Sequence, residues 1–326
     1  MIVQENERNA FDQRDIEWEL LDKYALFLLP RLATDNRCRF NISLVRLPFG
    51  SLAQHASIDP TTSALLVSHP SFNSSTPVEI SVVYYRAGYT PTDYPTEVEW
   101  ATRLLLERSN AIKCPTIALQ LAGAKKVQQV LASPGQLDRF LGIGSTTSSL
   151  DPAPLASLNL THAAQMLTSF TSLYPMDDTP LGVKAVELAY KEPERFVLKP
   201  QREGGGNNIY RMDIPPFLDA LAEKDKLLTS KGPKAREAYI LMDLIEPPLG
   251  ATAIMVKAGE ERGTKVEVVS ELGIYGVMLF KASSDGKGAK VLVNETVGHM
   301  LRTKGKDSDE GGVAVGFSVI DSPLLM

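Results

Sequence analysis

The sequence is poor in the residues that build metal centres and disulfide frameworks. Only two cysteines occur, Cys38 and Cys114, and neither belongs to a CxxC pair, so a zinc site or a disulfide framework is not indicated. The histidines follow no metal-ligand spacing: His55, His69, His162 and His299. A structural or incidental role is expected for each of them.

Long charged runs and long apolar runs are also absent. The net charge is −5 without a long basic run, which argues against a nucleic-acid partner. No run of 18 apolar residues occurs, so no membrane-spanning helix is predicted. The first residues, MIVQENERNAFDQRD, contain no basic segment followed by an apolar stretch. They therefore predict no secretory signal, and the cytoplasm is the expected location.

The first part of the chain has the pattern of an α/β domain. Its 326-residue length and 44% hydrophobic content suit a globular protein with room for two domains. Apolar residues at four-residue steps predict an amphipathic helix over residues 12–29. Short apolar runs predict strands over residues 42–47, 64–67 and 80–85, and helices are predicted over residues 97–109 and 117–131. This alternation indicates a layered α/β domain in the first part of the chain.

The second part of the chain begins with helices, and its pattern changes after residue 191. A Ser-, Thr- and Pro-rich stretch over residues 145–157 predicts an exposed connection. Helices are predicted over residues 160–173 and 181–191. Consecutive β-like runs follow at residues 196–198, 238–242, 265–272, 274–281 and 289–293. Consecutive strands after helices predict an antiparallel sheet in an α+β lobe.

The most informative segment is FVLKPQREGGGNNIY, residues 196–210. Its three consecutive glycines expose backbone N–H groups that can approach an anion closely. Lys199 would add a positive charge beside phosphate, and Glu203 would offer an oxygen ligand to Mg²⁺. The segment matches neither the P-loop nor the GxGxxG fingerprint. A flexible hairpin turn is the alternative interpretation.

A second segment, MLRTKGKDSDEGGVAVG at residues 300–316, carries related chemistry. Arg302 has the planar fork that suits a carboxylate, and Lys304 suits a phosphate. The glycine pair 311–312 begins another loop of small residues. A polar turn before a terminal strand is the alternative. Glu271 lies in a β-like apolar run, so it needs a partner, which could be a ribose hydroxyl or a lysine.

Several segments, in this order and spacing, resemble the eukaryotic glutathione synthetases: ERNAFDQR, YYRAGY, LLLERSNAIKCPTIALQLAGAKKVQQ, FVLKPQREGGGNN, YILMDLIEP, SELGIYG, MLRTK and GGVAVG. The resemblance covers nearly the whole chain. It implies a substrate-binding α/β domain over residues 1–123 and an ATP-grasp lobe with an antiparallel sheet over residues 124–326. It further implies the ATP- and Mg²⁺-dependent ligation of γ-glutamylcysteine and glycine through an acyl phosphate, and a possible homodimer.

The resemblance also implies roles for individual residues. ATP would be bound by Lys125, Lys199, Glu203, Gly204, Gly205, Gly206, Asn207, Asn208, Tyr210, Met242, Asp243, Leu244, Ile245, Glu271, Lys304 and Glu310. The peptide substrate would be bound by Glu7, Arg8, Asn9, Gln13, Arg86, Ala87, Gly88, Tyr89, Arg302, Val313 and Ala314. Glu203 is the implied Mg²⁺ ligand, and the implied catalytic groups are Arg302, Lys199 and the Gly204 amide. Support of the fold is the alternative for each residue.

Members of this family extend further at the N-terminus, in a part that carries two more Mg²⁺ ligands. The resemblance therefore implies that the chain lacks the N-terminal part of the family fold and that it would show little ligase activity alone. Three hypotheses stay open at this point. The chain is a glutathione synthetase, a non-catalytic remnant that binds ATP or glutathione, or a pseudo-enzyme subunit that assembles with a full-length partner.

Overall fold

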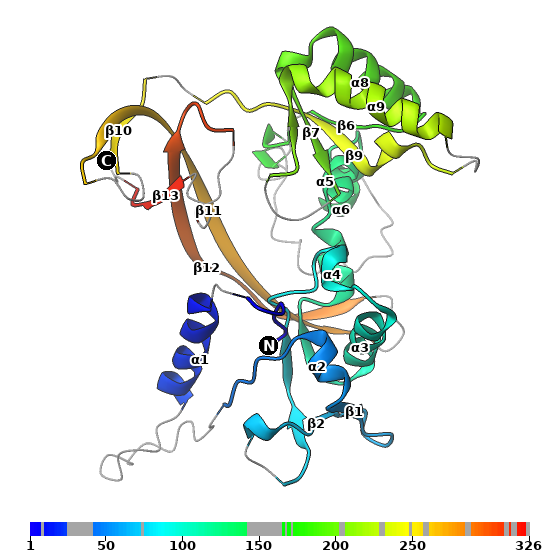
Figure 1. Cartoon of the computed structure of the whole chain (residues 1–326), viewed down its shortest axis with the longest axis vertical. Helices are drawn as coiled ribbons and strands as arrows, with labels where there is room; N and C mark the ends of the chain where they lie inside the picture. Colours follow the sequence, from blue (N-terminus) through cyan, green and yellow to red (C-terminus); the bar gives the residue numbers. More distant parts are fainter. Residues whose placement is uncertain are drawn as a thin grey trace. The chain divides into compact units, whose positions relative to one another are not determined.

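The computed structural model (Figure 1) divides into two compact units, Met1–Gly123 and Ala124–Met326. The roles assigned to the two parts from the sequence stay predictions. The residues that the structure describes are 1–7, 10–24, 42–72, 75–141, 165–166, 168–170, 172–201, 206–227, 232–247, 250–256, 261–283, 288–309, 313 and 318–323.

The first unit combines an antiparallel sheet with a parallel strand pair. The antiparallel sheet contains β1 (Ala56–Ile58), β2 (Leu65–Val67) and β3 (Val78–Ile80) in that order. The parallel pair is β4 (Val82–Tyr84) with β5 (Ile112–Cys114), joined by α3 (Glu97–Arg108). The other helices are α1 (Phe11–Tyr24), α2 (Phe49–Ala53), α4 (Ile117–Ala122), η1 (Pro70–Phe72) and η2 (Pro91–Asp93). One apolar cluster, which includes Leu65, Tyr85 and Leu106, fills the unit.

Three predictions for this unit need correction. The predicted strand 42–47 is wrong, because only Leu47 in it makes a β-bridge, with Ile2. The run 80–85 contains the end of β3 and the whole of β4, which belong to different sheets and are separated by Ser81. The predicted helix 117–131 is two helices, because α4 ends before Gly123 and α5 (Lys125–Leu131) belongs to the second unit.

The second unit contains a four-stranded sheet in the order β6-β9-β7-β8, with antiparallel neighbours. Its strands are β6 (Leu173–Pro175), β7 (Phe196–Pro200), β8 (Ile209–Tyr210) and β9 (Tyr239–Asp243). Its helical segments are α5, α6 (Gln136–Leu141), α8 (Pro180–Lys191), α9 (Ile214–Leu227), η3 (Pro193–Arg195), η4 (Arg211–Asp213) and η5 (Ala235–Ala238). Phe196 and Leu198 of β7 pack with residues of α8 and α9 on one face of the sheet (Figure 1). Alternate residues of β7 therefore point to the opposite face.

A second four-stranded sheet follows, in the order β10-β11-β12-β13. Its strands are β10 (Thr252–Met255), β11 (Thr264–Ala282), β12 (Ala289–Gly305) and β13 (Ser318–Asp321). The long pair β11–β12 is antiparallel, and β10 and β13 flank the end that contains Gly305. The predicted antiparallel sheets of an α+β lobe are thus confirmed. The predicted strands 265–272 and 274–281 are one continuous strand, with Gly273 paired to Met300 inside it.

Several helices of this unit differ from the prediction. The predicted helix 160–173 is wrong at its end, because Leu173 begins β6. Residues 160–164 and the predicted connection 145–157 lie outside the described residues. The sequence analysis missed α6 and α9, and the pair Pro215–Pro216 explains the second omission. Proline usually interrupts a helix but is tolerated in its first turn, where these two lie. No helix among the described residues has the length and apolar character needed to cross a bilayer.

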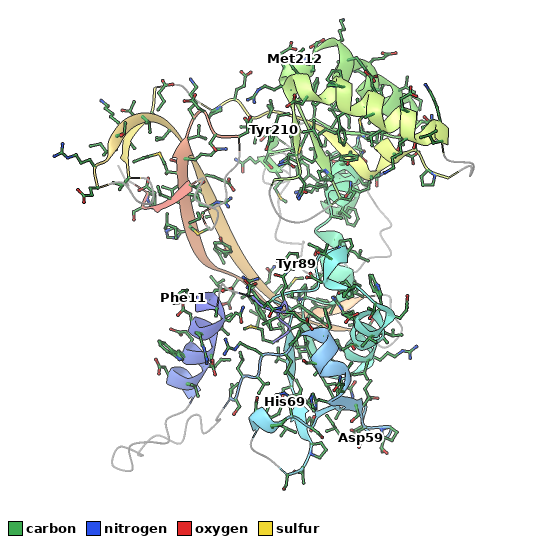
Figure 2. The ribbon with its side chains drawn as sticks, in the orientation of Figure 1. Phe11, Asp59, His69, Tyr89, Tyr210 and Met212 are labelled. Carbon is green, nitrogen blue, oxygen red and sulfur yellow. The ribbon has the colours of Figure 1, made fainter. Side chains whose placement is uncertain are left out.

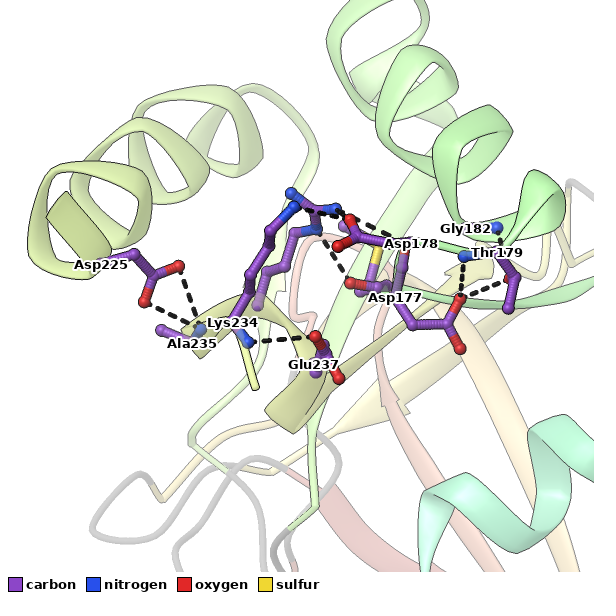
Figure 3. A network of polar contacts seen from close by, with 10 residues as sticks. Asp177, Asp178, Thr179, Gly182, Asp225, Lys234, Ala235 and Glu237 are labelled. Atoms are coloured by element: carbon purple, nitrogen blue, oxygen red, sulfur yellow. Dashed lines mark hydrogen bonds and ion pairs between the residues drawn. The ribbon is translucent and has the colours of Figure 1, made fainter. Parts of the chain in front are cut away.

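A polar network holds the loop after β6 against the segment before β9 (Figure 3). The Asp178 carboxylate accepts hydrogen bonds from Lys234 Nζ at 2.6 Å and from Arg236 Nη2 at 2.5 Å. Arg236 Nε also donates to the Met176 carbonyl oxygen at 2.9 Å, and Asp225 accepts from the Ala235 amide at 3.0 Å. The network therefore links β6 and β9 at one end of this antiparallel strand pair, where β6 ends and β9 begins.

We expect this network to make stability depend on pH. The hydrogen bond from Lys234 lowers the pKa of Asp178 below its ordinary value of 3.8. Because the folded pKa is the lower one, the contribution is complete above the unfolded pKa and is lost as the pH falls through the folded pKa. Thermal melts from about pH 5 to about pH 2 should therefore fall less steeply for Asp178→Asn than for the wild type. Asp213→Asn is the control, and equal slopes for all three proteins would contradict the expectation.

Candidate functional site

One face of the β6-β9-β7-β8 sheet carries several predicted ATP contacts. Val197 pairs with both Tyr210 of β8 and Met242 of β9. Paired residues in an antiparallel sheet share a face, as do residues two positions apart in one strand. Lys199, Tyr210 and Met242 therefore lie on the face opposite to α8 and α9. Lys199 is near the end of β7, beside the predicted glycine-rich segment.

One face of the β11–β12 pair carries three further predicted contacts. Glu271 pairs with Arg302, and Lys304 is two positions beyond Arg302, so the three side chains share a face. Arg302 Nη2 forms an ion pair with Glu271 Oε1. The sequence suggested a ribose hydroxyl or a lysine as the partner of Glu271; in this structure the partner is Arg302, and the Glu271 side chain is 65% exposed. The remaining guanidinium N–H groups of Arg302 are the ones suited to a substrate carboxylate.

Contacts of both sheets meet at the carbonyl oxygen of Asp309. Lys304 Nζ donates to it at 3.0 Å, and the Tyr210 hydroxyl donates to it at 3.4 Å. Asn208 Nδ2 in turn donates to the Tyr210 hydroxyl at 3.1 Å. Figure 2 labels Tyr210 at this position. Three predicted ATP-binding residues from two separate sheets are thus brought together by a residue that the sequence analysis did not select.

An ion pair with Arg211 also holds Asp309 in position. Arg211 Nη1 lies 2.9 Å from both carboxylate oxygens of Asp309. Arg211 has a φ of 48°, a left-handed backbone conformation that is uncommon for residues other than glycine. Neither Arg211 nor Asp309 was predicted as a site residue. The only available signal was the position of Asp309, directly before the residues Glu310 and Gly311.

The end of β9 and Leu244–Ile245 were predicted to contact ATP, and the family resemblance implies that adenine would be held there by backbone groups. The Asp243 amide donates to the Ser172 carbonyl oxygen at 3.2 Å, and the Leu244 amide donates to the Arg195 carbonyl oxygen at 2.8 Å. Among the described residues, the Ile245 amide has no hydrogen-bond acceptor, and its side chain is 77% exposed. Of the amides at these three positions, the one at Ile245 is therefore the donor left for an adenine ring.

Lys125 lies at the first residue of α5. The next residue fixes this helix to the end of β7, because the Lys126 amide donates to Gln201 Oε1 at 2.8 Å. The Gln201 amide in turn donates to the Ala238 carbonyl oxygen at 3.0 Å. Lys125 and Lys199 are thus held near the same strand end. Gln201 is, like Arg211 and Asp309, a residue that the sequence analysis missed.

The first unit brings three of the predicted peptide-binding residues close to one another. Arg86 Nε lies 2.6 Å from Asp12 Oδ2, and Arg86 Nη1 lies 3.8 Å from Glu7 Oε2. Glu7 and Gln13 line one cleft of about 480 Å³, which Arg46 also lines. This volume is in the range of small-molecule sites. Asp12 was not predicted as a site residue, so its contact with Arg86 is a feature that the sequence analysis missed.

The neighbouring residues Ala87 and Gly88 are buried parts of the scaffold. The Gly88 amide donates to Asp93 Oδ2 at 2.9 Å, and its carbonyl oxygen accepts from Tyr94 and from Gln120. Gly88 has a φ of 98°, and a Cβ there would lie 2.9 Å from the ring of Phe49. These contacts support the fold. Tyr89 is 39% exposed (Figure 2), which leaves its side chain accessible to a ligand.

The remaining predicted residues are less informative. Gly206 and Asn207 are exposed, and Val313 is half-buried. Several lie outside the described residues: Arg8, Asn9, Glu203, Gly204, Gly205, Glu310 and Ala314. Within the described part, no three His, Cys, Asp or Glu side chains gather as a metal site would require. Mg²⁺ commonly uses one or two carboxylates together with substrate phosphates, so its binding stays a prediction that depends on Glu203.

Comparison with known proteins identifies the family. The model of the eukaryotic glutathione synthase ATP-binding domain matches residues 32–325. The chain belongs to this family. The membership confirms the resemblance on which the sequence analysis depended.

The relatives of this family are longer than the chain. It is 38% identical over 323 residues to the glutathione synthetase of Homo sapiens, covering 99% of this chain and 56% of that one. It is 36% identical over 327 residues to that of Dictyostelium discoideum, covering 100% and 57%. It is 37% identical over 321 residues to the glutathione synthetase large chain of Schizosaccharomyces pombe, covering 98% and 53%. The chain thus spans about half the length of the curated relatives that it matches.

A solved structure supports the fold. The apo form of GSS30, a glutathione synthetase-like effector from Globodera pallida, superimposes with a TM-score of 0.57 at 20% sequence identity. The match covers 100% of this chain and 55% of that one. At this level of identity, the match shows that the family fold is shared.

Proposed function

We propose that this chain provides the ATP-binding machinery of a glutathione synthetase, which joins γ-glutamylcysteine to glycine with the hydrolysis of ATP. The observation that carries the proposal is the convergence of Lys304 and Tyr210 on the Asp309 carbonyl oxygen. It brings predicted nucleotide contacts from two sheets to one place. Membership of the family supports the same conclusion.

In the first step, an oxygen of the dipeptide carboxylate attacks the γ-phosphorus of ATP. The bond from the γ-phosphorus to the β–γ bridging oxygen breaks, ADP leaves, and an acyl phosphate forms. Lys199, Lys125 and Lys304 would offset the negative charge that develops on the phosphate oxygens. Mg²⁺, held by Glu203 and the phosphates, would supply further charge neutralisation when bound.

In the second step, the glycine amine attacks the carbonyl carbon of the acyl phosphate. The carbon–oxygen bond to phosphate breaks, inorganic phosphate leaves, and the attacking nitrogen releases its proton as the peptide bond forms. Arg302 would hold a substrate carboxylate through the N–H groups not used by Glu271. Water must be kept from the acyl phosphate during this step, because it would otherwise hydrolyse the intermediate.

Replacing Lys304 with glutamine should weaken Mg-ATP binding about tenfold, which corresponds to about 1.4 kcal/mol. The reason is that the variant removes a positive charge beside the phosphates and keeps a side chain of similar length. Isothermal titration calorimetry of the whole chain would measure the change. Lys306→Gln is the control, since Lys306 forms an exposed ion pair with Glu267 at 2.9 Å and has no proposed ATP contact. Equal affinities for the two variants would contradict the role of Lys304.

The catalytic part of the proposal needs its own test. Phosphate release, even at the low rate expected for this chain alone, should depend on both γ-glutamylcysteine and glycine, and the product should contain the new peptide bond. Binding of Mg-ATP without such turnover would support the alternative of a non-catalytic ATP- or glutathione-binding protein. A homodimer and a cytoplasmic location are also part of the proposal. Sedimentation and cell fractionation, respectively, would test them.

A further inference from the structure

Asp309 has an unusual position among the residues of the proposed site. Its carbonyl oxygen accepts hydrogen bonds from Lys304 and Tyr210, and its carboxylate pairs with Arg211. Lys304 belongs to β12, whereas Tyr210 ends β8 and Arg211 begins η4. Asp309 therefore accepts hydrogen bonds from residues of both sheets. Its position depends on Lys304, Tyr210 and Arg211.

The backbone conformation of Arg211 indicates that its side chain has a specific function. A φ of 48° favours glycine, because a Cβ in the left-handed region approaches the backbone closely. Arginine at this position adopts the less favourable conformation and places Nη1 at 2.9 Å from both Asp309 oxygens. Arg211 thus combines an unfavourable backbone conformation with a specific contact to Asp309, whose carbonyl oxygen accepts a hydrogen bond from Lys304.

We infer that Arg211 and Asp309 are positioning residues, whose ion pair sets Tyr210 and Lys304 at the separation that the ATP phosphates require. Arg211 directly follows Tyr210, and Asp309 holds the Lys304 ammonium through its carbonyl oxygen. The ion pair consequently fixes the position of Tyr210 in β8 relative to that of Lys304 in β12. The inference deepens the proposed function and rests on it.

Arg211→Gly separates this role from an ordinary structural one. Glycine suits the positive φ, so the unfolding midpoint of the variant should equal or exceed that of the wild type. Its dissociation constant for Mg-ATP should nevertheless rise about twofold to fivefold, the effect expected from the loss of one exposed ion pair. The matched control is Lys306→Gln. Its ion pair with Glu267 has the same 2.9 Å separation and exposures of 41% and 48%, against 47% and 42% for Arg211 and Asp309.

A charge exchange completes the experiment. The double variant Arg211→Asp with Asp309→Arg keeps an ion pair and the carbonyl oxygen at position 309, and aspartate tolerates a positive φ better than most residues. It should recover most of the affinity that Arg211→Asp alone loses. Absence of recovery, or unchanged affinity in Arg211→Gly when Lys304→Gln is impaired, would overturn this inference alone. Failure of the wild-type chain to bind Mg-ATP would overturn the proposed function and, with it, this inference.

Discussion

Gly182→Ala should destabilise the second unit by about 3 kcal/mol, the upper part of the usual range for overpacked sites. Gly182 is buried in the first turn of α8, where its amide donates to the Thr179 hydroxyl at 3.2 Å. A Cβ at this position would lie 2.5 Å from Asp177 Oδ1 and closer still to the Asp177 carbonyl oxygen. The backbone of Asp177 cannot move freely to make room, because Arg236 and the Thr179 cap hold the same loop.

Urea unfolding followed by circular dichroism would measure this effect, together with hydrogen exchange of the α8 amides. Both tryptophans, Trp18 and Trp100, belong to the first unit, so their fluorescence should report little change. Gly298→Ala is the matched control in the second unit, since a Cβ there would meet no atom within 4 Å. Equal stability of the two alanine variants would show that the loop at Asp177 adapts to the added methyl group.

Arg302→Met should raise the dissociation constant for γ-glutamylcysteine about 10-fold to 100-fold, the range expected when one charged hydrogen-bonding group is removed. Methionine keeps an unbranched side chain but lacks the guanidinium fork that would bind the substrate carboxylate. Arg302→Lys should restore only part of the affinity, because a lysine offers charge without the planar pair of donors. Isothermal titration calorimetry with γ-glutamylcysteine would measure both variants.

Glu271→Gln tests whether Arg302 acts through its ion pair with Glu271 or on the substrate. This variant removes the ionic partner of Arg302 and leaves the guanidinium in place. If Arg302 binds a substrate carboxylate, Arg302→Met should lose far more affinity for γ-glutamylcysteine, measured without ATP, than Glu271→Gln, whose predicted contact is with ATP. Equal losses in the two variants would indicate that the ion pair itself is the important feature, and the substrate role of Arg302 would be wrong.

The sequence predicted the fold best where local signals are strong. The predicted helix over residues 97–109 corresponds to α3 and has a capping box from Thr96 and Glu99. Residues 196–198 begin β7, which pairs with β8 on one side and β9 on the other. This central position in the sheet agrees with the apolar residues of β7. The strand predicted at residues 42–47 failed because an apolar run does not show whether a partner strand is available. In this structure Leu44 and Val45 line the cleft beside Glu7 instead of joining a sheet.

The site shows the same division between local and distant information. Lys199 and Lys304 could be selected because each accompanies a glycine-bearing segment. Arg211 and Asp309 are separated by 98 positions in the chain, and no local pattern relates an arginine in a turn to an aspartate so far along the sequence. The occupied amides at Asp243 and Leu244 also depend on partners from other segments. Contacts of this kind emerge only once the sheets are formed.

A crystal structure of the chain with Mg²⁺ and a non-hydrolysable ATP analogue would test the central claim most directly. The claim is that Lys199 and Tyr210 of one sheet and Lys304 of the other share a single nucleotide site. The account predicts phosphate oxygens within hydrogen-bond distance of both lysine ammonium groups, with the adenine beside Ile245. A nucleotide bound elsewhere, with Lys199 and Lys304 both remote from its phosphates, would contradict it.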